Sequence, residues 1–195
     1  AADIVPLLEK PETVDRSMGD IHPSGNPHVH LNPHNILLIA EVLNQRFQQL
    51  DKKNAAVIQK QYETFVLRWK QFIIKWEKQS AELKGKPIIT HHRSWSYLID
   101  WLGLELVDTL EPKPGIPPNA SHLEQLLSKV RNTTVLAVIR TPYDSQEASE
   151  WLAGKTSIPP LVLPYTVGGD DTSSDLFSLY DQMVKQLNGA LNDQH

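Results

Sequence analysis

Histidines are concentrated in one short stretch of this chain. Four of the eight fall within thirteen residues, at His22, His28, His30 and His34. Two more, His91 and His92, are adjacent in the sequence beyond a long segment of mixed polar and apolar residues. Imidazole nitrogens bind divalent transition metals, so histidines clustered at this density favour a metal site.

The triplet His28-Val29-His30 lies at the middle of that stretch. In an extended backbone both imidazoles would point to the same side, because side chains alternate between the two faces. Neighbouring imidazoles favour Zn2+ and also Ni2+ or Cu2+. Turn-forming residues at 25–27 and 32–33 would hold the triplet rigidly. A histidine-rich loop that only faces solvent, or that captures metal adventitiously, is the alternative explanation.

Composition narrows the choice of metal and of partner. The chain has 195 residues, no cysteine and two methionines, which excludes thiolate zinc sites and iron–sulfur clusters and argues against Cu(I). A formal net charge of -4 and a pI near 6.1 provide no basic surface for nucleic acid or an anionic membrane. No run approaches the roughly 18 apolar residues of a membrane helix, so we expect no direct membrane insertion.

Enzyme motifs are missing from the sequence. It contains no His-Glu-x-x-His, no Gly-x-Ser-x-Gly and no glycine-rich phosphate loop. Glu111 has the chemistry of a general base, but the proline-rich run 111–118 indicates a rigid loop at the mouth of a cleft. We therefore expect a binding protein and not an enzyme.

Two helices are expected to follow the histidine stretch. Pro33 suits a first helical turn, and apolar residues then recur at spacings of four and three, which predicts one buried face over about four turns. These residues are Ile36, Ala40, Leu43, Phe47 and Leu50. A second helix is expected over 54–83 and would be roughly 45 Å long. That length suits a brace between two lobes, although an ordinary bundle or coiled-coil helix has the same pattern.

From residue 87 onwards short apolar runs alternate with amphipathic segments. Strands predicted over 87–90, 104–107, 134–139 and 161–163 alternate with helices over 94–102, 121–130, 146–153 and 175–191. The alternation predicts an α/β fold with a four-stranded parallel sheet and helices on both faces. Ligands bind at the carboxyl ends of such strands. The polar residues expected at this edge are His91, His92, Glu111, Arg140, Asp170 and Asp171.

Four motifs occur in the order and spacing of a known family. The run 19–33 contains Asn-Pro-His-Val-His-Leu-Asn-Pro, and the run 90–98 contains His-Arg-Ser-Trp-Ser-Tyr. They resemble the Asn-Pro-His-x-x-Leu-Asp/Asn-Pro and His-x-Ser/Ala-aromatic-x-Tyr signatures of the zinc- and manganese-binding solute-binding proteins of ABC transporters. The runs 111–118 and 166–169 resemble further segments of the zinc-type branch. The resemblance covers essentially the whole chain.

The resemblance implies a metal site that includes His28 and His92. His28 holds the motif position after Asn-Pro, and counting five residues back from Tyr97 selects His92 and not His91. Manganese-type members carry glutamate at the position of His92. Histidine there implies Zn2+ as the bound ion, with Mn2+ less expected.

The remaining ligands are left open by the resemblance. Asp170, Asp171 or a water would complete the shell. His30 and His91 are neighbours that would orient or supplement the primary ligands, whereas His22 and His34 would only flank the site.

The resemblance also implies a division of the chain. Family members have a whole N-terminal lobe before this segment, and that lobe supplies a first histidine ligand. Residues 1–53 would then be the remnant of that lobe, 54–84 the long linking helix and 85–195 the C-terminal α/β lobe. Lacking one ligand, the chain would bind zinc more weakly than a full-length member.

The function implied is that of an extracytoplasmic solute-binding protein, periplasmic or tethered to the cell surface, which captures Zn2+ and delivers it to the permease of an ABC-type importer. Neutral imidazoles would bind the ion, so binding is expected to fall as pH drops through about 6.5. One alternative is a manganese or other divalent-metal carrier of the same fold. The other is a non-transporting adhesin or metal-storage protein that uses its long helix and proline-rich rim as a partner surface.

Overall fold

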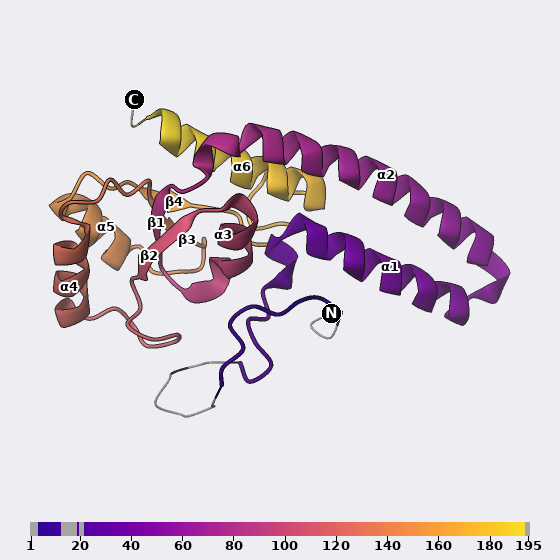
Figure 1. Cartoon of the computed structure of the whole chain (residues 1–195), viewed down its shortest axis with the longest axis horizontal. Helices are drawn as coiled ribbons and strands as arrows, with labels where there is room; N and C mark the ends of the chain where they lie inside the picture. The colour runs from indigo at the N-terminus through magenta and orange to yellow at the C-terminus, as the bar shows by residue number, and fades with distance from the viewer. Residues whose placement is uncertain (1–3, 13–18, 20–21, 194–195) are drawn as a thin grey trace.

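A four-stranded parallel sheet organises the second half of the chain. The structure is a computed structural model that describes residues 4–12, 19 and 22–193. The strands are β1 Pro87–Thr90, β2 Glu105–Thr109, β3 Val138–Arg140 and β4 Pro160–Val162. They pair in parallel in the order β2-β1-β3-β4 (Figure 1). The predicted parallel sheet is confirmed, with β3 starting four residues later than the pattern indicated.

Helices cover both faces of this sheet, as predicted. On one side lie α2 (Ala55–Gln79), α3 (Ser96–Leu102) and α6 (Leu176–Asn192), and on the other α4 (Ala120–Val130) and α5 (Glu147–Lys155). Consecutive strand residues point to opposite faces, so Ile88 belongs to the first apolar cluster and Ile89 to the second. Both side chains are 0% exposed. Packing on both faces therefore fixes the position of β1, and with it the position of His91 and His92, which follow this strand.

Two long helices form a hairpin that extends beyond the sheet (Figure 1). The first, α1, runs over Pro33–Leu50 and begins where predicted, with the Asn32 side chain accepting the His34 amide at 2.9 Å. The second, α2, has 25 residues, about 38 Å at 1.5 Å per residue. It ends four residues before the predicted boundary, and the 3₁₀ turn Ala81–Leu83 leads from it towards β1.

An aromatic cluster attaches the second half of α2 to α6. Trp69 and Trp76 of α2 are 0% exposed. The Trp76 ring stacks on Tyr180 of α6 with centroids 4.9 Å apart, and its indole N–H donates to the Asp181 carboxylate at 2.6 Å. Lys75 donates to the same carboxylate at 2.7 Å. Through these contacts the hairpin that follows the histidine stretch is fixed to the sheet.

The outer part of α1 is exposed, so the prediction of one buried face over four turns is wrong. Ile36 is 8% exposed, whereas Leu43 is 45%, Phe47 51% and Leu50 68% exposed. The hairpin extends past the sheet, and along its outer part α2 covers only one side of α1 (Figure 1). Helical periodicity showed which residues share a face but not whether a second layer lies against it.

Replacing Trp76 should destabilise the fold strongly. Trp76→Ala removes a fully buried ring and leaves the Asp181 carboxylate without its indole donor, so we expect a loss of about 3–5 kcal/mol in the free energy of unfolding. Ile74→Ala, on the same helix at a position 68% exposed, should change it by less than about 0.5 kcal/mol. Urea unfolding followed by far-UV circular dichroism measures both. Equal midpoints for the two variants would contradict the role given to this cluster.

Candidate metal site

A tight turn presents His28 between the N-terminal segment and α1. Val29–Leu31 forms a 3₁₀ turn in which Val29 and Leu31 are 5% and 0% exposed. The Asn35 side chain donates to the Val29 carbonyl at 3.0 Å and closes the turn from α1. The extended backbone expected for 28–30 is therefore not formed; the Leu31 amide donates to the His28 carbonyl at 3.2 Å and closes the chain into this turn. The turn still brings His28 and His30 close to one residue, Tyr165.

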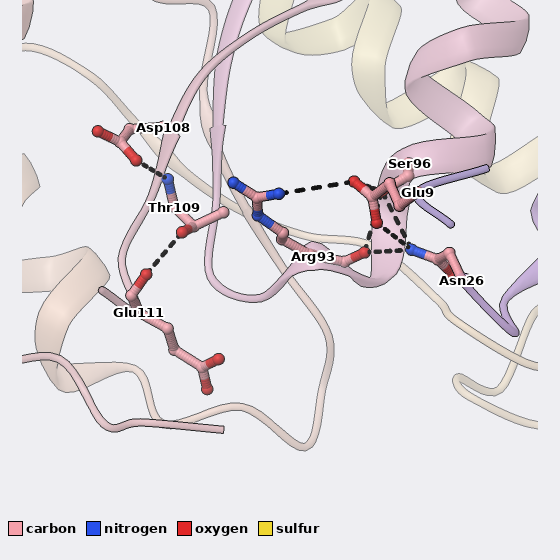
Figure 2. A network of polar contacts seen from close by, with 7 residues as sticks. All are labelled: Glu9, Asn26, Arg93, Ser96, Asp108, Thr109 and Glu111. Carbon is pink, nitrogen blue, oxygen red and sulfur yellow. Dashed lines mark hydrogen bonds and ion pairs between the residues drawn. The ribbon is translucent and has the colours of Figure 1, made fainter. Parts of the chain in front are cut away.

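The side chain of Asn26 joins the His28 turn to the segment that carries His92. Its amide nitrogen lies 2.8 Å from the Glu9 carboxylate, 2.9 Å from the Arg93 carbonyl and 3.2 Å from the Ser96 hydroxyl (Figure 2). Its amide oxygen accepts the His28 backbone N–H at 3.0 Å. Asn26 is only 7% exposed, so breaking these bonds would leave buried polar groups unpaired, each at a cost of about 1–3 kcal/mol.

Tyr97 reinforces the same junction from α3. Its buried hydroxyl donates to the Asn26 carbonyl at 2.9 Å and accepts the Leu8 amide at 3.1 Å. The backbone N–H of Asn26 in turn donates to the Leu8 carbonyl at 2.8 Å. Three segments far apart in the sequence are thus held together by the motif residues Asn26 and Tyr97.

His92 lies just beyond the carboxyl end of β1 and is oriented by Glu111, just beyond β2. Its Nδ1 lies 2.6 Å from Glu111 Oε2, and the Gly115 amide donates to that same oxygen at 2.9 Å. The Thr109 hydroxyl donates to the Glu111 carbonyl at 2.6 Å and holds the backbone of this residue (Figure 2). A carboxylate accepts, so the Nδ1 of His92 carries the proton, and a neutral ring then has its lone pair on Nε2.

Tyr165, in the loop after β4, contacts both histidines of the triplet. Its hydroxyl is hydrogen bonded to His28 Nδ1, and His30 Nε2 donates to its backbone carbonyl at 3.1 Å. The Tyr165 ring meets the His28 and His30 rings edge-on, with centroids 5.6 Å and 5.2 Å apart. These contacts leave the lone pair of His30 on Nδ1, because a carbonyl only accepts.

Burial keeps these side chains neutral. It lowers the pKa of His28 to about 4, with the neighbouring charges of His30, His92 and His22 adding to the effect. Burial also lowers the pKa of His30, although the hydrogen bond to the Tyr165 carbonyl opposes this. The pKa of the Tyr165 hydroxyl is raised far above its usual range by burial and by the charge of Asp144. Neutral imidazoles are the form that binds metal.

The two predicted ligands line one cavity of about 540 Å³. His28 enters from the turn and His92 from the end of β1, and His22 also lines it, with its ring 6.4 Å from that of His28. Prolines from the N-terminal segment, the histidine motif and the loop after β2 form part of its wall, namely Pro11, Pro27, Pro112 and Pro114. The prediction that the run 111–118 shapes the mouth of a cleft agrees with this arrangement.

Other residues named from the sequence lie elsewhere. The His91 ring is only 5% exposed and is not part of the cavity wall, and its Nδ1 has no hydrogen-bond partner among the residues described. His34 pairs with Glu77 across the hairpin at 2.8 Å. Asp170 accepts bonds from Thr172 and Ser173 within its own loop, and neither it nor Asp171 lines the cavity.

Three residues that arrange the site were not recognised in this role from the sequence. The sequence pattern indicates a turn at Asn26 and a rigid loop at Glu111, although both lie inside the motifs. Tyr165 is separated from His28 by 137 positions. Its place after the fourth strand was the one available signal, because side chains at the carboxyl ends of parallel strands gather at one edge.

Comparisons with known proteins identify the family and the fold of the chain. Residues 2–190 match the family model described as ZnuA, zinc-uptake complex component A, periplasmic. A comparison with curated protein sequences finds no match. Among solved structures, ZnuA is similar with 20% identity and a TM-score of 0.74, over 94% of this chain and 67% of that one.

Two further solved structures have the same fold. FpvC of Pseudomonas aeruginosa, a solute-binding protein determined with Mn2+, has 18% identity and a TM-score of 0.69 over 87% of this chain and 62% of its own. The laminin-binding protein Lbp of Streptococcus pyogenes has 19% identity and a TM-score of 0.67 over 91% of this chain and 68% of its own. The chain thus spans about two thirds of the length of these structures. At such identities the likeness establishes the fold alone, while the family match covers nearly the whole chain: it belongs to the ZnuA family, zinc-uptake complex component A, periplasmic.

Proposed function

We propose that the chain is part of a solute-binding protein that captures Zn2+ as its cargo through His28 and His92. The observation that carries this proposal is that both side chains line one cavity, with the Nδ1 of His92 held by Glu111 at 2.6 Å. That contact leaves Nε2 of His92 as the nitrogen with a lone pair. A histidine whose second nitrogen is bonded to a carboxylate is the usual arrangement of a zinc ligand.

The donor set favours zinc over manganese. Both proposed ligands are imidazoles, which suit Zn2+, while Mn2+ prefers carboxylate, carbonyl and water oxygens. Glu111 Oε2 is bonded to His92 and to the Gly115 amide, and Glu111 does not line the cavity, so we expect it to act on the ring and not as a ligand. The solved relatives are known with several metals, since FpvC was determined with Mn2+ and with Ni2+.

Two imidazoles are fewer donors than a closed zinc site uses, which is about four. Among residues 4–12, 19 and 22–193 no group of three or more histidine, aspartate or glutamate side chains is arranged to hold a metal. We propose that water, together with a histidine from the part of ZnuA-type proteins that has no counterpart in this chain, completes the shell. We also propose that residues 1–53 are the remnant of an N-terminal lobe, 54–84 the long linking helix and 85–195 the C-terminal α/β lobe.

Delivery to an importer is the role that this capture would serve. The family description, zinc-uptake complex component A, periplasmic, supports an extracytoplasmic location and an ABC transporter permease as the partner. No helix in the described part of the chain is long and apolar enough to cross a membrane. The fold shared with Lbp, described as laminin-binding, makes an adhesin the competing function, and a protein that fails to bind zinc would favour it.

Removing the imidazole of His92 should weaken zinc binding severely. We expect His92→Ala to raise the zinc Kd by about 100-fold or more, because even the loss of a residue that only supports a ligand typically reduces affinity 10- to 100-fold. His34→Ala is the matched control, since His34 pairs with Glu77 on the helix hairpin. Competition against a chelating dye at pH 7 measures each Kd. An unchanged Kd for His92→Ala would remove His92 from the site.

Replacing Glu111 should weaken zinc binding, because this residue orients the His92 ring. Glu111→Gln keeps the size of the side chain but replaces the carboxylate that accepts from His92 and Gly115. We expect the zinc Kd to rise by about tenfold, with no more than a small change in stability. Isothermal titration with zinc and thermal unfolding of the metal-free protein separate the two effects. If affinity stays at the wild-type value, Glu111 serves only to shape its loop.

His28 should make the stability of the metal-free protein depend on pH. Burial lowers its pKa from 6.5 to about 4, so between these values the unfolded chain binds the proton that the folded chain refuses. This contribution is absent above pH 6.5 and destabilises the fold as pH falls towards 4. The expected proton competition at about pH 6.5 therefore does not apply to His28.

The variant His28→Gln isolates this effect. Between pH 7 and pH 4.5 the wild type should lose about 1 kcal/mol more unfolding free energy than the variant, after allowance for the partial exposure of the ring. Urea unfolding at the two pH values, with zinc removed by chelation, provides the comparison. Parallel losses in both proteins would show that His28 is not kept neutral by its surroundings.

A further inference from the structure

Tyr165 touches both histidines of the motif, but through different atoms. Its side-chain hydroxyl is bonded to Nδ1 of His28, while its main-chain carbonyl accepts from Nε2 of His30 at 3.1 Å. It lies in the loop after β4, at the edge of the sheet where His92 also lies. Tyr165 therefore contacts the two imidazoles through different groups: a hydroxyl, which can donate or accept, and a carbonyl, which can only accept.

The carbonyl of Tyr165 fixes the state of His30. A carbonyl oxygen can only accept, so Nε2 of His30 must carry the ring proton. The lone pair of His30 then lies on Nδ1, and His30 is not among the residues that line the cavity shared by His28 and His92. Binding of a metal through Nε2 of His30 would require this bond to break and the ring to change tautomer.

The hydroxyl of Tyr165 acts differently on His28. A hydroxyl can donate or accept, so it stays bonded to Nδ1 in either tautomer of the ring. When Nε2 of His28 binds a cation, the ring proton is on Nδ1, and the hydroxyl oxygen is already in place to accept it. Nε2 of His28 makes no hydrogen bond to any residue within the described ranges, so it remains the nitrogen that can bind an ion.

The position of Tyr165 is itself fixed from the His92 side. Its ring meets that of Trp95 edge-on, with centroids 5.4 Å apart. Trp95 is 0% exposed and lies in the 3₁₀ turn Arg93–Trp95 directly after His92. The contact ties the orientation of His28 to the turn that follows the second proposed ligand.

We propose that Tyr165 is a positioning residue that gives the two motif histidines different roles: its hydroxyl orients His28 for metal capture, and its carbonyl keeps His30 out of the metal shell. The inference rests on the proposed function, since it concerns how the same site is prepared for its cation. It goes further by naming the residue that decides which of two adjacent imidazoles binds.

A double-mutant cycle between Tyr165 and His28 tests this role. Tyr165→Phe keeps the ring and its packing on Trp95 but removes the hydroxyl, and we expect the zinc Kd to rise about tenfold. His28→Ala should raise it more. Adding Tyr165→Phe to His28→Ala should then change nothing further, because the hydroxyl acts only through that ring. Tyr143→Phe is the matched control, since Tyr143 is 71% exposed.

Two further measurements separate positioning from a general structural role. In the metal-free protein, the imidazole 15N shifts of His28 should change in Tyr165→Phe while those of His92 and the thermal midpoint stay the same. His30→Gln, whose amide can still donate to the Tyr165 carbonyl, should alter the zinc Kd by less than about threefold, whereas loss of a ligand would raise it about 100-fold.

The outcomes distinguish the two proposals. A wild-type protein that binds no zinc refutes the proposed function. A wild type that binds zinc, with Tyr165→Phe at the same Kd or with unchanged His28 shifts, refutes the role of Tyr165 alone. An additional tenfold loss in the double variant, or a large loss in His30→Gln, also overturns it.

Discussion

The side chain of Asn26 is the contact on which the site depends. Its amide reaches the Arg93 carbonyl at 2.9 Å and the Glu9 carboxylate at 2.8 Å, while its oxygen holds the His28 amide at 3.0 Å. Together with the Tyr97 hydroxyl, it joins the turn that carries His28 to the turn that follows His92. Because the group is buried, the bonds must be made together or lost together. The relative placement of the two imidazoles thus depends on this buried amide, with Tyr97 and Tyr165 adding to the connection.

The three central imidazoles differ in what holds their second nitrogen. His92 is bonded to the Glu111 carboxylate, His28 to the Tyr165 hydroxyl and His30, through Nε2, to a backbone carbonyl. A carboxylate and a hydroxyl can both accept from Nδ1 and leave Nε2 to the metal, whereas the carbonyl that accepts from Nε2 of His30 leaves only Nδ1, on a ring that does not line the cavity. The contact made by one ring nitrogen decides which nitrogen of that ring keeps the lone pair.

The sequence predicted the parallel sheet, the two helical layers and the start of α1, because periodicity and Pro33 report directly on local structure. It also selected His28 and His92 by motif position, and the structure brings both to one cavity. It failed where the answer depended on distant partners. Leu50 is 68% exposed because no second layer among the described residues meets the outer hairpin, and Tyr165 reaches His28 across 137 positions. Local sequence spacing predicts neither the exposure of Leu50 nor the contact between Tyr165 and His28.

The central claim is that His28 and His92 bind one zinc ion. A crystal structure of the zinc-loaded protein, with anomalous difference maps recorded on both sides of the zinc absorption edge, tests it most directly. The account predicts one peak in the cavity at about 2.0–2.1 Å from Nε2 of His28 and from Nε2 of His92, with Tyr165 and Glu111 still bonded to the two Nδ1 atoms. A peak bound to His30, or a zinc ion held only by His34 and Glu77 on the helix hairpin, would contradict it.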